Sequence, residues 1–258
     1  MMSIENQLAE TVLACNRLTT AVNNKITDID QQMAQCITKI NNQLNQTLYL
    51  LPRIVITHNQ QLEINENHPQ KHPFNFQIHD DVEASVHMRI QANPKDRTAD
   101  QIALLQEMGL DIGVDMHIHD HYRMPFNVIK LSWTKREPIS YWLAFPNTAD
   151  SAASAIPLNT FITIGAFVKV LAGRASGVWC EGARLGKWTF CRTQFSPAGF
   201  GRYTHIHPYR DSDSGEVLIA LPAAITGHID NPGQWYPNIE LQKAHNVTST
   251  TNATTTDA

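Results

Sequence analysis

The sequence predicts an α+β fibrous protein: an N-terminal trimeric coiled coil, a short strand-rich shaft and a C-terminal all-β head. Three observations lead to this fold class. The first fifty residues contain no Gly and no Pro. All twelve Gly lie at or after Gly109, and all five Trp lie at or after Trp133. Apolar residues recur with helical spacing in the N-terminal part, but they form short strand-like runs in the C-terminal part.

An apolar stripe runs along the N-terminal part. Its members are Ile4, Leu8, Cys15, Leu18, Val22, Ile26, Ile29, Met33, Cys36, Ile40, Leu44 and Leu48, with Thr11 filling one gap. Steps of three and four residues alternate over most of this stripe, which is the heptad pattern of a coiled coil. The step from Val22 to Ile26 resembles a stutter, and Pro52 stops the helix. We therefore expect a coiled-coil helix over residues 1–51.

The flanks of this helix are polar but carry few charges. Asn, Gln and Thr make up 19 of the first 50 residues, and only seven residues there are charged. A narrow apolar seam cannot bury itself in a monomer, so identical partner chains are implied. Ile at successive seam positions, as at Ile26 and Ile29, favours three strands over two. The alternative is one amphipathic helix packed on its own globular domain, which usually has a wider apolar face.

Residues 52–112 alternate between short apolar and polar runs. The cleanest alternation comprises Val82, Ala84, Val86, Met88 and Ile90, and it predicts a strand with one buried face. These runs are too short and polar for a self-standing domain, so we expect a shaft or collar of strands wrapped between chains. Thr98 and Gln101 form a capping-box pattern, and Gly109 fits a helix C-terminus. A short helix is therefore expected near 99–108.

Residues 113–243 predict a β-rich head, and residues 244–258 predict a disordered tail of low complexity. The clearest strands are expected at 126–133, 141–145, 161–171, 177–181, 187–192 and 216–221, with Gly-containing turns between them. The runs around Trp179 and Trp188 read as a hairpin with one Trp on each strand. Cys180 and Cys191 flank that hairpin and could pair across it, whereas synthesis in the cytoplasm favours two reduced thiols.

Composition and motifs exclude several classes of function. The formal net charge is −4 without clusters of Lys or Arg, which argues against nucleic-acid binding. No apolar run is long enough for a membrane span, and the N-terminus has no secretory pattern, so we expect synthesis in the host cytoplasm. The phosphate loop, the dinucleotide fingerprint and the nucleophile elbow of hydrolases are missing. The protein is therefore predicted not to be an enzyme.

Two His-x-His motifs are candidate metal sites. They comprise His117 with His119 and His205 with His207. On a strand, both imidazoles of such a motif point to the same side. Three chains would then supply six imidazoles, enough for an octahedral transition metal. The alternative is that these imidazoles form ordinary hydrogen bonds and that no cofactor is bound.

Trp179 and Trp188 are candidate binding residues for a glycan, because indoles on neighbouring strands stack on sugar rings when they are exposed. Core packing is the alternative and the more common position of Trp.

Three segments resemble the tail fibre proteins of tailed bacteriophages and of related contractile injection particles. They are residues 18–30 of the predicted helix, the head segment Met124-Pro-Phe-Asn-Val-Ile-Lys-Leu131, and Tyr203-Thr-His-Ile-His-Pro-Tyr209. The resemblance implies a homotrimer in a virion tail or an extracellular contractile particle. It implies anchorage to a baseplate or tail protein and a distal head that contacts a host surface receptor. It also implies that some fibre tips hold metal through His-x-His pairs, which the two motifs above match.

Two other functions remain open beside the fibre. One is a particle-borne polysaccharide depolymerase or esterase. Depolymerase spikes usually carry a long β-helix, for which this head is too short, and no nucleophile motif supports an esterase. The other is an internal connector that never meets the host.

Overall fold

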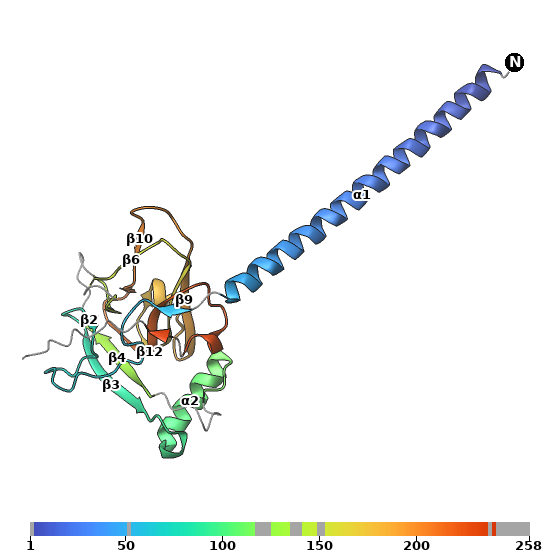
Figure 1. Ribbon diagram of the computed structural model, residues 1–258. Helices are drawn as coiled ribbons and strands as arrows, with labels where there is room; N and C mark the ends of the chain where they lie inside the picture. Colours follow the sequence, from blue (N-terminus) through green and yellow to red (C-terminus); the bar gives the residue numbers. More distant parts are fainter. Residues whose placement is uncertain are drawn as a thin grey trace, which may run out of the picture. The chain divides into compact units, whose positions relative to one another are not determined.

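The computed structural model of the chain describes residues 3–50, 53–116, 125–134, 141–148, 153–236 and 239–240 (Figure 1). The chain divides into two compact units, Met1–Pro52 and Arg53–Ala258. The first unit is one helix, and the second, here called the head unit, contains all the strands. The mixed helix-and-sheet class predicted from the sequence is therefore confirmed, with a long N-terminal helix and a strand-rich C-terminal part.

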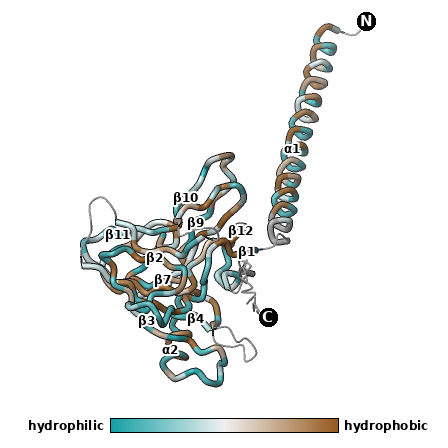
Figure 2. The backbone as a smooth tube through the Cα atoms, turned by 60° about the vertical axis from the view of Figure 1, so that its left-hand side comes forward, coloured by the Kyte–Doolittle hydropathy of each residue, from teal (hydrophilic) through white to brown (hydrophobic). Residues whose placement is uncertain are grey.

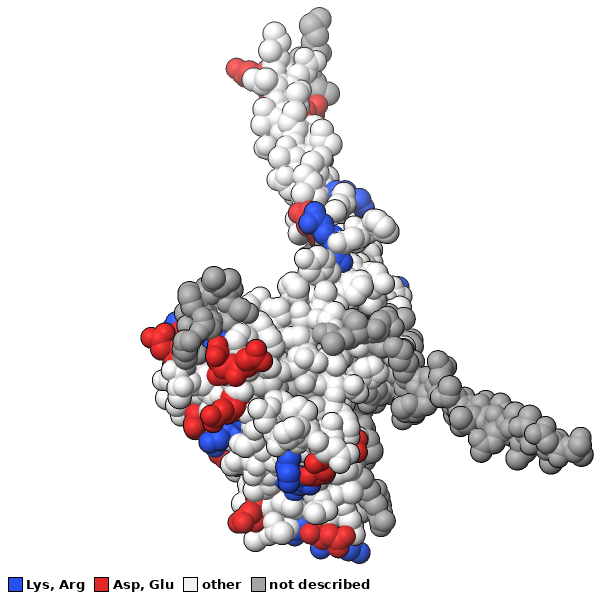
Figure 3. Space-filling view, turned by 90° about the vertical axis from the view of Figure 1, so that its left-hand side faces the viewer, with Lys and Arg blue, Asp and Glu red and all other residues white. Residues whose placement is uncertain are grey.

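Helix α1 (Ile4–Leu50) has 47 residues, which corresponds to about 70 Å at 1.5 Å per residue. Its threonine hydroxyls are satisfied within the helix. Thr11, Thr19, Thr20, Thr27, Thr38 and Thr47 each donate to the carbonyl oxygen four residues earlier. Figure 3 shows that uncharged atoms dominate the visible face of this helix. The polar flank therefore needs neither salt bridges nor a partner to satisfy its hydroxyl groups.

The large apolar side chains between Ile4 and Leu44 of α1 are exposed in the single chain, with fractional exposures between 48% and 83%. They are Ile4, Leu8, Val12, Leu13, Leu18, Val22, Ile26, Ile29, Met33, Ile37, Ile40 and Leu44. Figure 2 shows hydrophobic and hydrophilic segments alternating along the helix. Val12, Leu13 and Ile37 come in addition to the predicted stripe. None of the helices in the described residues is long and apolar enough to cross a membrane.

The head unit is built around one seven-stranded sheet. Its strands are β1 (Ile54–Val55), β3 (Glu83–Ile90), β4 (Phe126–Trp133), β7 (Ile162–Ala172), β9 (Trp188–Phe195), β12 (Gly215–Thr226) and β13 (Ile239–Glu240). Three further pairs are β2 (Phe76–Ile78) with β5 (Ala144–Pro146), β6 (Ala155–Pro157) with β10 (Tyr203–His205), and β8 (Ala175–Ser176) with β11 (Tyr209–Arg210). The strands expected at 126–133, 161–171, 187–192 and 216–221 are confirmed as β4, β7, β9 and β12.

Strand β12 is the centre of the sheet because it changes partner halfway along its length. Its first half pairs with β4, its second half pairs with β1, and β7 runs along its other edge. The register shifts between Ala220 and Ala223, where the buried Leu221 has a positive φ of 54°. A leucine rarely adopts this conformation. The indole of Trp235 donates to the Leu221 carbonyl oxygen at 2.8 Å and so stabilises the irregular turn of the strand.

The expected shaft over residues 52–112 is wrong, because residues 53–112 belong to the head unit. Strands β1 and β3 join the central sheet, and Val55, Leu62 and Ile90 are buried in its core. The reason is visible in β3, which pairs only with β4 and has alternating exposed and half-buried residues. Polar alternation of this kind is typical of an edge strand with one covered face. It does not require a separate collar between chains.

Helix α2 (Ala99–Ile112) confirms the predicted capping box at Thr98 and Gln101, but it runs past the expected end. Gly113, with φ 80°, is its C-terminal cap. Gly109 lies inside the helix, where a Cβ atom would come within 2.7 Å of the Val114 carbonyl oxygen. Gly109 is therefore needed for close approach of the returning backbone, and Gly113 ends the helix.

The hairpin expected around Trp179 is also wrong, because Val178–Cys180 forms the 3-10 helix η2. Gly177, with φ 78°, turns the chain out of β8 and prevents a continuous strand. Cys180 and Cys191 are free thiols in the core. Burial raises the pKa of the Cys180 thiol well above its usual range and that of Cys191 to about 12. Both sulfurs are therefore unreactive at neutral pH. Two short 3-10 helices, η1 (Pro94–Asp96) and η3 (Pro232–Gln234), complete the described elements.

Candidate binding surface of histidines and aromatic residues

The two tryptophans predicted to bind glycan lie in the core, so this prediction is wrong. Trp179 is 0% exposed and Trp188 is 1% exposed. They belong to different clusters of the core, and they do not form the cross-strand pair of a hairpin. Neither indole offers a face to a ligand in solvent. Their role is packing, as is usual for Trp in a sheet core.

Of the predicted metal ligands, His117 and His119 lie outside the described residues. His205 and His207 are described, and they belong to a row of rings of which Tyr203 and His205 are exposed and His207 and Tyr209 are half-buried. Tyr203, His205, His207 and Tyr209 alternate along the chain with residues 204, 206, 208 and 210, of which 206, 208 and 210 are buried. Successive ring centroids lie 5.3, 4.9 and 5.1 Å apart. We call these four residues the aromatic track.

Hydrogen bonds fix the two imidazoles of the aromatic track. His205 Nδ1 lies 2.9 Å from the Ser154 hydroxyl oxygen, and His207 Nε2 lies 3.2 Å from the Tyr209 hydroxyl oxygen. His207 Nδ1 is buried without a hydrogen-bond partner among the described residues. Burial, with the neighbouring His205, lowers the pKa of His207 to about 4. The His207 imidazole is therefore neutral at pH 7.

This geometry bears on whether the pair could hold a transition metal. The part of the chain that the structure describes contains no cluster of three or more possible ligands. In His207 one nitrogen faces Tyr209 and the other is buried. The ring would have to turn out of its row before it could bind a metal shared with His205. The arrangement of one chain therefore does not fit a metal chelate, although it fits hydrogen-bonded, stacked imidazoles well.

Aromatic residues from a distant segment extend the track. Tyr141 lies 5.1 Å from Tyr209, and Trp142 and Phe145 lie 6.3 and 5.9 Å from His207, between ring centroids. The two segments are joined by a bridge between Trp142 and Tyr209 and by the Leu143 amide, which donates to the Pro208 carbonyl oxygen. This contribution was not predicted from the sequence. Its only signal is the aromatic content of residues 141–145, which predicts a strand there.

A groove lies at the Tyr203 end of the track and has a volume of about 580 Å³. It is lined by Pro157, Asn159, Pro197, Gly199, Phe200, Gly201, Arg202 and Tyr203. Phe200 is fully exposed at 108%, and Tyr203 is 59% exposed. We call this the Phe200 groove. It joins the aromatic track because Tyr203 belongs to both.

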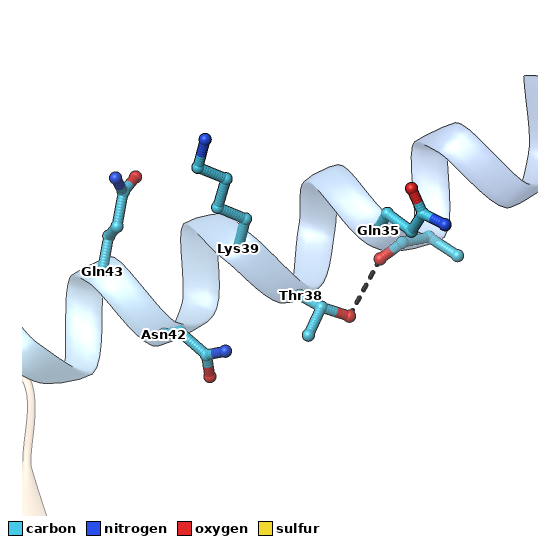
Figure 4. A pocket seen from close by; sticks show the side chains of 6 residues that line it. Gln35, Thr38, Lys39, Asn42 and Gln43 are labelled. Carbon is cyan, nitrogen blue, oxygen red and sulfur yellow. Dashed lines mark hydrogen bonds between the residues drawn. The ribbon is translucent and has the colours of Figure 1, made fainter.

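A second pocket lies on α1, and residues of this helix alone line it. Gln35, Thr38, Lys39, Asn42 and Gln43 line it from one side of a single helix (Figure 4). The Thr38 hydroxyl is already used by the Ala34 carbonyl oxygen. No second wall faces these side chains from the same helix, so they are the polar flank of α1 rather than a ligand site.

No family model matches the chain, and no curated protein matches it.

Proposed function

We propose that this chain is a structural tail fibre subunit of a phage-like particle. In this proposal three copies associate through α1, the helical region is attached to a baseplate or tail protein, and the head unit binds the host cell surface. The observation that carries the proposal is the exposure of the large apolar side chains from Ile4 to Leu44 of α1. The resemblance of residues 18–30, 124–131 and 203–209 to tail fibre proteins supports the same assignment.

Leaving the apolar side chains of α1 exposed to water is energetically unfavourable. Full burial of one Val, Leu, Ile or Met side chain contributes roughly 1.5–3 kcal/mol. Ile26, Ile29 and Met33 are each more than half exposed, so most of that contribution is unrealised in a single chain. Helical stability in proteins comes mainly from packing of an apolar face. Association of three copies through the seam would supply that packing.

The native cysteines of α1 provide a direct test. Cys15 and Cys36 are exposed thiols at seam positions, whereas Cys180 and Cys191 are buried. In a parallel trimer in register, each seam cysteine meets its own copies. We expect sedimentation equilibrium to show trimers. After mild oxidation we expect disulfide-linked dimers in the Cys15→Ala variant and, separately, in the Cys36→Ala variant, because each variant keeps one seam cysteine. SDS gels without reductant measure the products.

Two outcomes would contradict the trimer. One is a stable monomer at micromolar concentration. The other is a cross-link that needs Cys15 and Cys36 together, because this would indicate antiparallel helices.

One contact favours the esterase alternative, namely the hydrogen bond between Ser154 Oγ and His205 Nδ1 at 2.9 Å. A serine nucleophile needs a neighbouring base of this kind. The base usually needs a third group to orient it, and within the described residues the rings next to His205 are the phenol of Tyr203 and the imidazole of His207. This arrangement is weaker than a triad, so hydrolysis ranks second.

Ester hydrolysis can be tested separately from assembly. We expect wild type and Ser154→Ala to hydrolyse p-nitrophenyl acetate equally slowly, at the rate of the buffer control. A saturable rate in wild type that falls at least about a hundredfold in Ser154→Ala would instead establish the esterase.

A further inference from the structure

The Phe200 groove is held in place by its backbone. Residues 196–202 connect β9 with β10, and two hydrogen bonds tie them to Leu158, the residue that follows β6. The Ala198 amide donates to the Leu158 carbonyl oxygen at 2.9 Å, and the Leu158 amide donates to the Arg202 carbonyl oxygen at 2.8 Å. Gly199 and Gly201 have φ of 88° and 76°, and a Cβ atom added at either would meet nothing within 4 Å. These glycines therefore serve the turn rather than packing. Phe200 lies between the two glycines, and its side chain is exposed to solvent on a loop that these hydrogen bonds hold in place.

The lining of the groove combines three kinds of contact. Pro157, Pro197, Phe200 and Tyr203 form apolar and aromatic walls. Asn159 adds an amide that can both donate and accept hydrogen bonds. Among the described lining residues Arg202 alone carries a charge at pH 7, and no carboxylate lines the groove beside it. The groove is thus an aromatic site with one guanidinium group, which suits a ligand with ring faces, hydroxyl groups and a carboxylate.

We propose that the Phe200 groove binds a carboxylate-bearing sugar of a glycan chain. Phe200 and Tyr203 contact the C–H face of the sugar, and Arg202 pairs with its carboxylate through two parallel hydrogen bonds. The neighbouring units of the glycan extend over His205, His207 and Tyr209 of the aromatic track. This inference rests on the proposed function, because it names the ligand class that the head unit would meet on a host surface.

Charge and size distinguish this ligand from other classes. A nucleic acid needs several cations to neutralise its phosphates, and this groove supplies one. A neutral glycan would leave Arg202 without a partner in the contact. A volume of about 580 Å³ is within the range of small-ligand sites, so it accommodates a short stretch of a chain rather than a folded domain.

The test uses the full-length protein and isothermal titration calorimetry. The probes are oligomers of galacturonic acid and of sialic acid, their carboxyl-reduced counterparts, and hexaglutamate as an acidic peptide. We expect an acidic oligosaccharide to bind wild type, with affinity falling about tenfold or more in Arg202→Gln and less in Arg202→Lys, which keeps the charge but loses the bidentate geometry. Phe200→Ala should weaken binding roughly threefold to tenfold. Carboxyl reduction of the probe should have the same effect as Arg202→Gln.

Three results would overturn the inference. The first is equal affinity for the acidic and the carboxyl-reduced oligosaccharides. The second is an affinity for hexaglutamate equal to that for the acidic oligosaccharide. The third is that neither acidic oligosaccharide binds. Phe200 and Arg202 are exposed, so their variants are expected to unfold at the wild-type temperature, which circular dichroism verifies. Sedimentation of the same samples reports the oligomeric state. A trimer that fails to bind these sugars would leave the fibre proposal intact and remove only the ligand.

Discussion

Substitution of Ile29 by Asp is expected to convert the proposed trimer into monomers. Ile29 lies at a seam position on α1 and is 53% exposed in the single chain, and in the proposed trimer the partner chains would cover it. In a trimer the variant places three carboxylates against one another inside an apolar seam. Burial of unpaired charges is strongly unfavourable. We expect the dissociation constant to rise at least about a thousandfold, which equals about 4 kcal/mol, as measured by sedimentation equilibrium.

The matched control for this variant is Gln31→Asp. Residue 31 follows Ile29 by two positions, so it lies on the polar flank of α1. The Gln31→Asp substitution introduces the same carboxylate, at a similar cost in helix propensity, but places it outside the seam. The control should remain trimeric. If both variants are trimeric, or both dissociate, the stripe is not the contact surface and the trimer proposal fails.

Substitution of Trp235 by Ala is expected to destabilise the head unit by about 3–5 kcal/mol, the usual cost of truncating a buried Trp. Trp235 is 0% exposed, and its ring packs 5.2 Å from that of Phe190. The variant would also remove the indole hydrogen bond to the Leu221 carbonyl oxygen. The irregular turn of β12 would then lose both its packing and its donor. Urea unfolding, followed by circular dichroism in the β region, measures the loss.

The comparison for Trp235→Ala is Phe200→Ala. Both variants truncate an aromatic side chain, but Phe200 is fully exposed. Its variant should change the free energy of unfolding by less than about 0.5 kcal/mol, as is usual at surface positions. Equal free energies of unfolding of the two variants would show that the Trp235 side chain is not part of the cooperative core.

Elements that could be predicted from the sequence are those whose signals are local. The three-and-four spacing from Ile4 to Leu44 predicted α1, and the capping box at Thr98 predicted the start of α2. The run from Phe126 to Trp133 predicted β4 with its bounds. In each case the periodicity belongs to the element itself and does not depend on a distant partner.

The features that escaped prediction depend on contacts between distant segments. Strand β1 pairs with Ile225 through Val55, so residues 53–112 could not be assigned to the head from their own pattern. Burial of Trp179 likewise depends on packing against other strands of the core. At the binding surface, His205 and His207 were recognised as a pair. Their neighbours Tyr141 and Trp142 come from a distant segment, which the bridge between Trp142 and Tyr209 and the hydrogen bond from Leu143 to Pro208 bring beside them.

The composition of the polar flank of α1 determines how association of the proposed trimer would respond to salt and temperature. Its hydroxyl groups bond to its own backbone, as at Thr27 and Thr38, and charged residues are few. Cohesion of a trimer through this helix would therefore owe little to ion pairs, and dilution or concentration of salt would change it little. It would depend on apolar burial, which weakens on cooling. A particle built this way would tolerate broad changes in salinity and would be least cohesive in the cold.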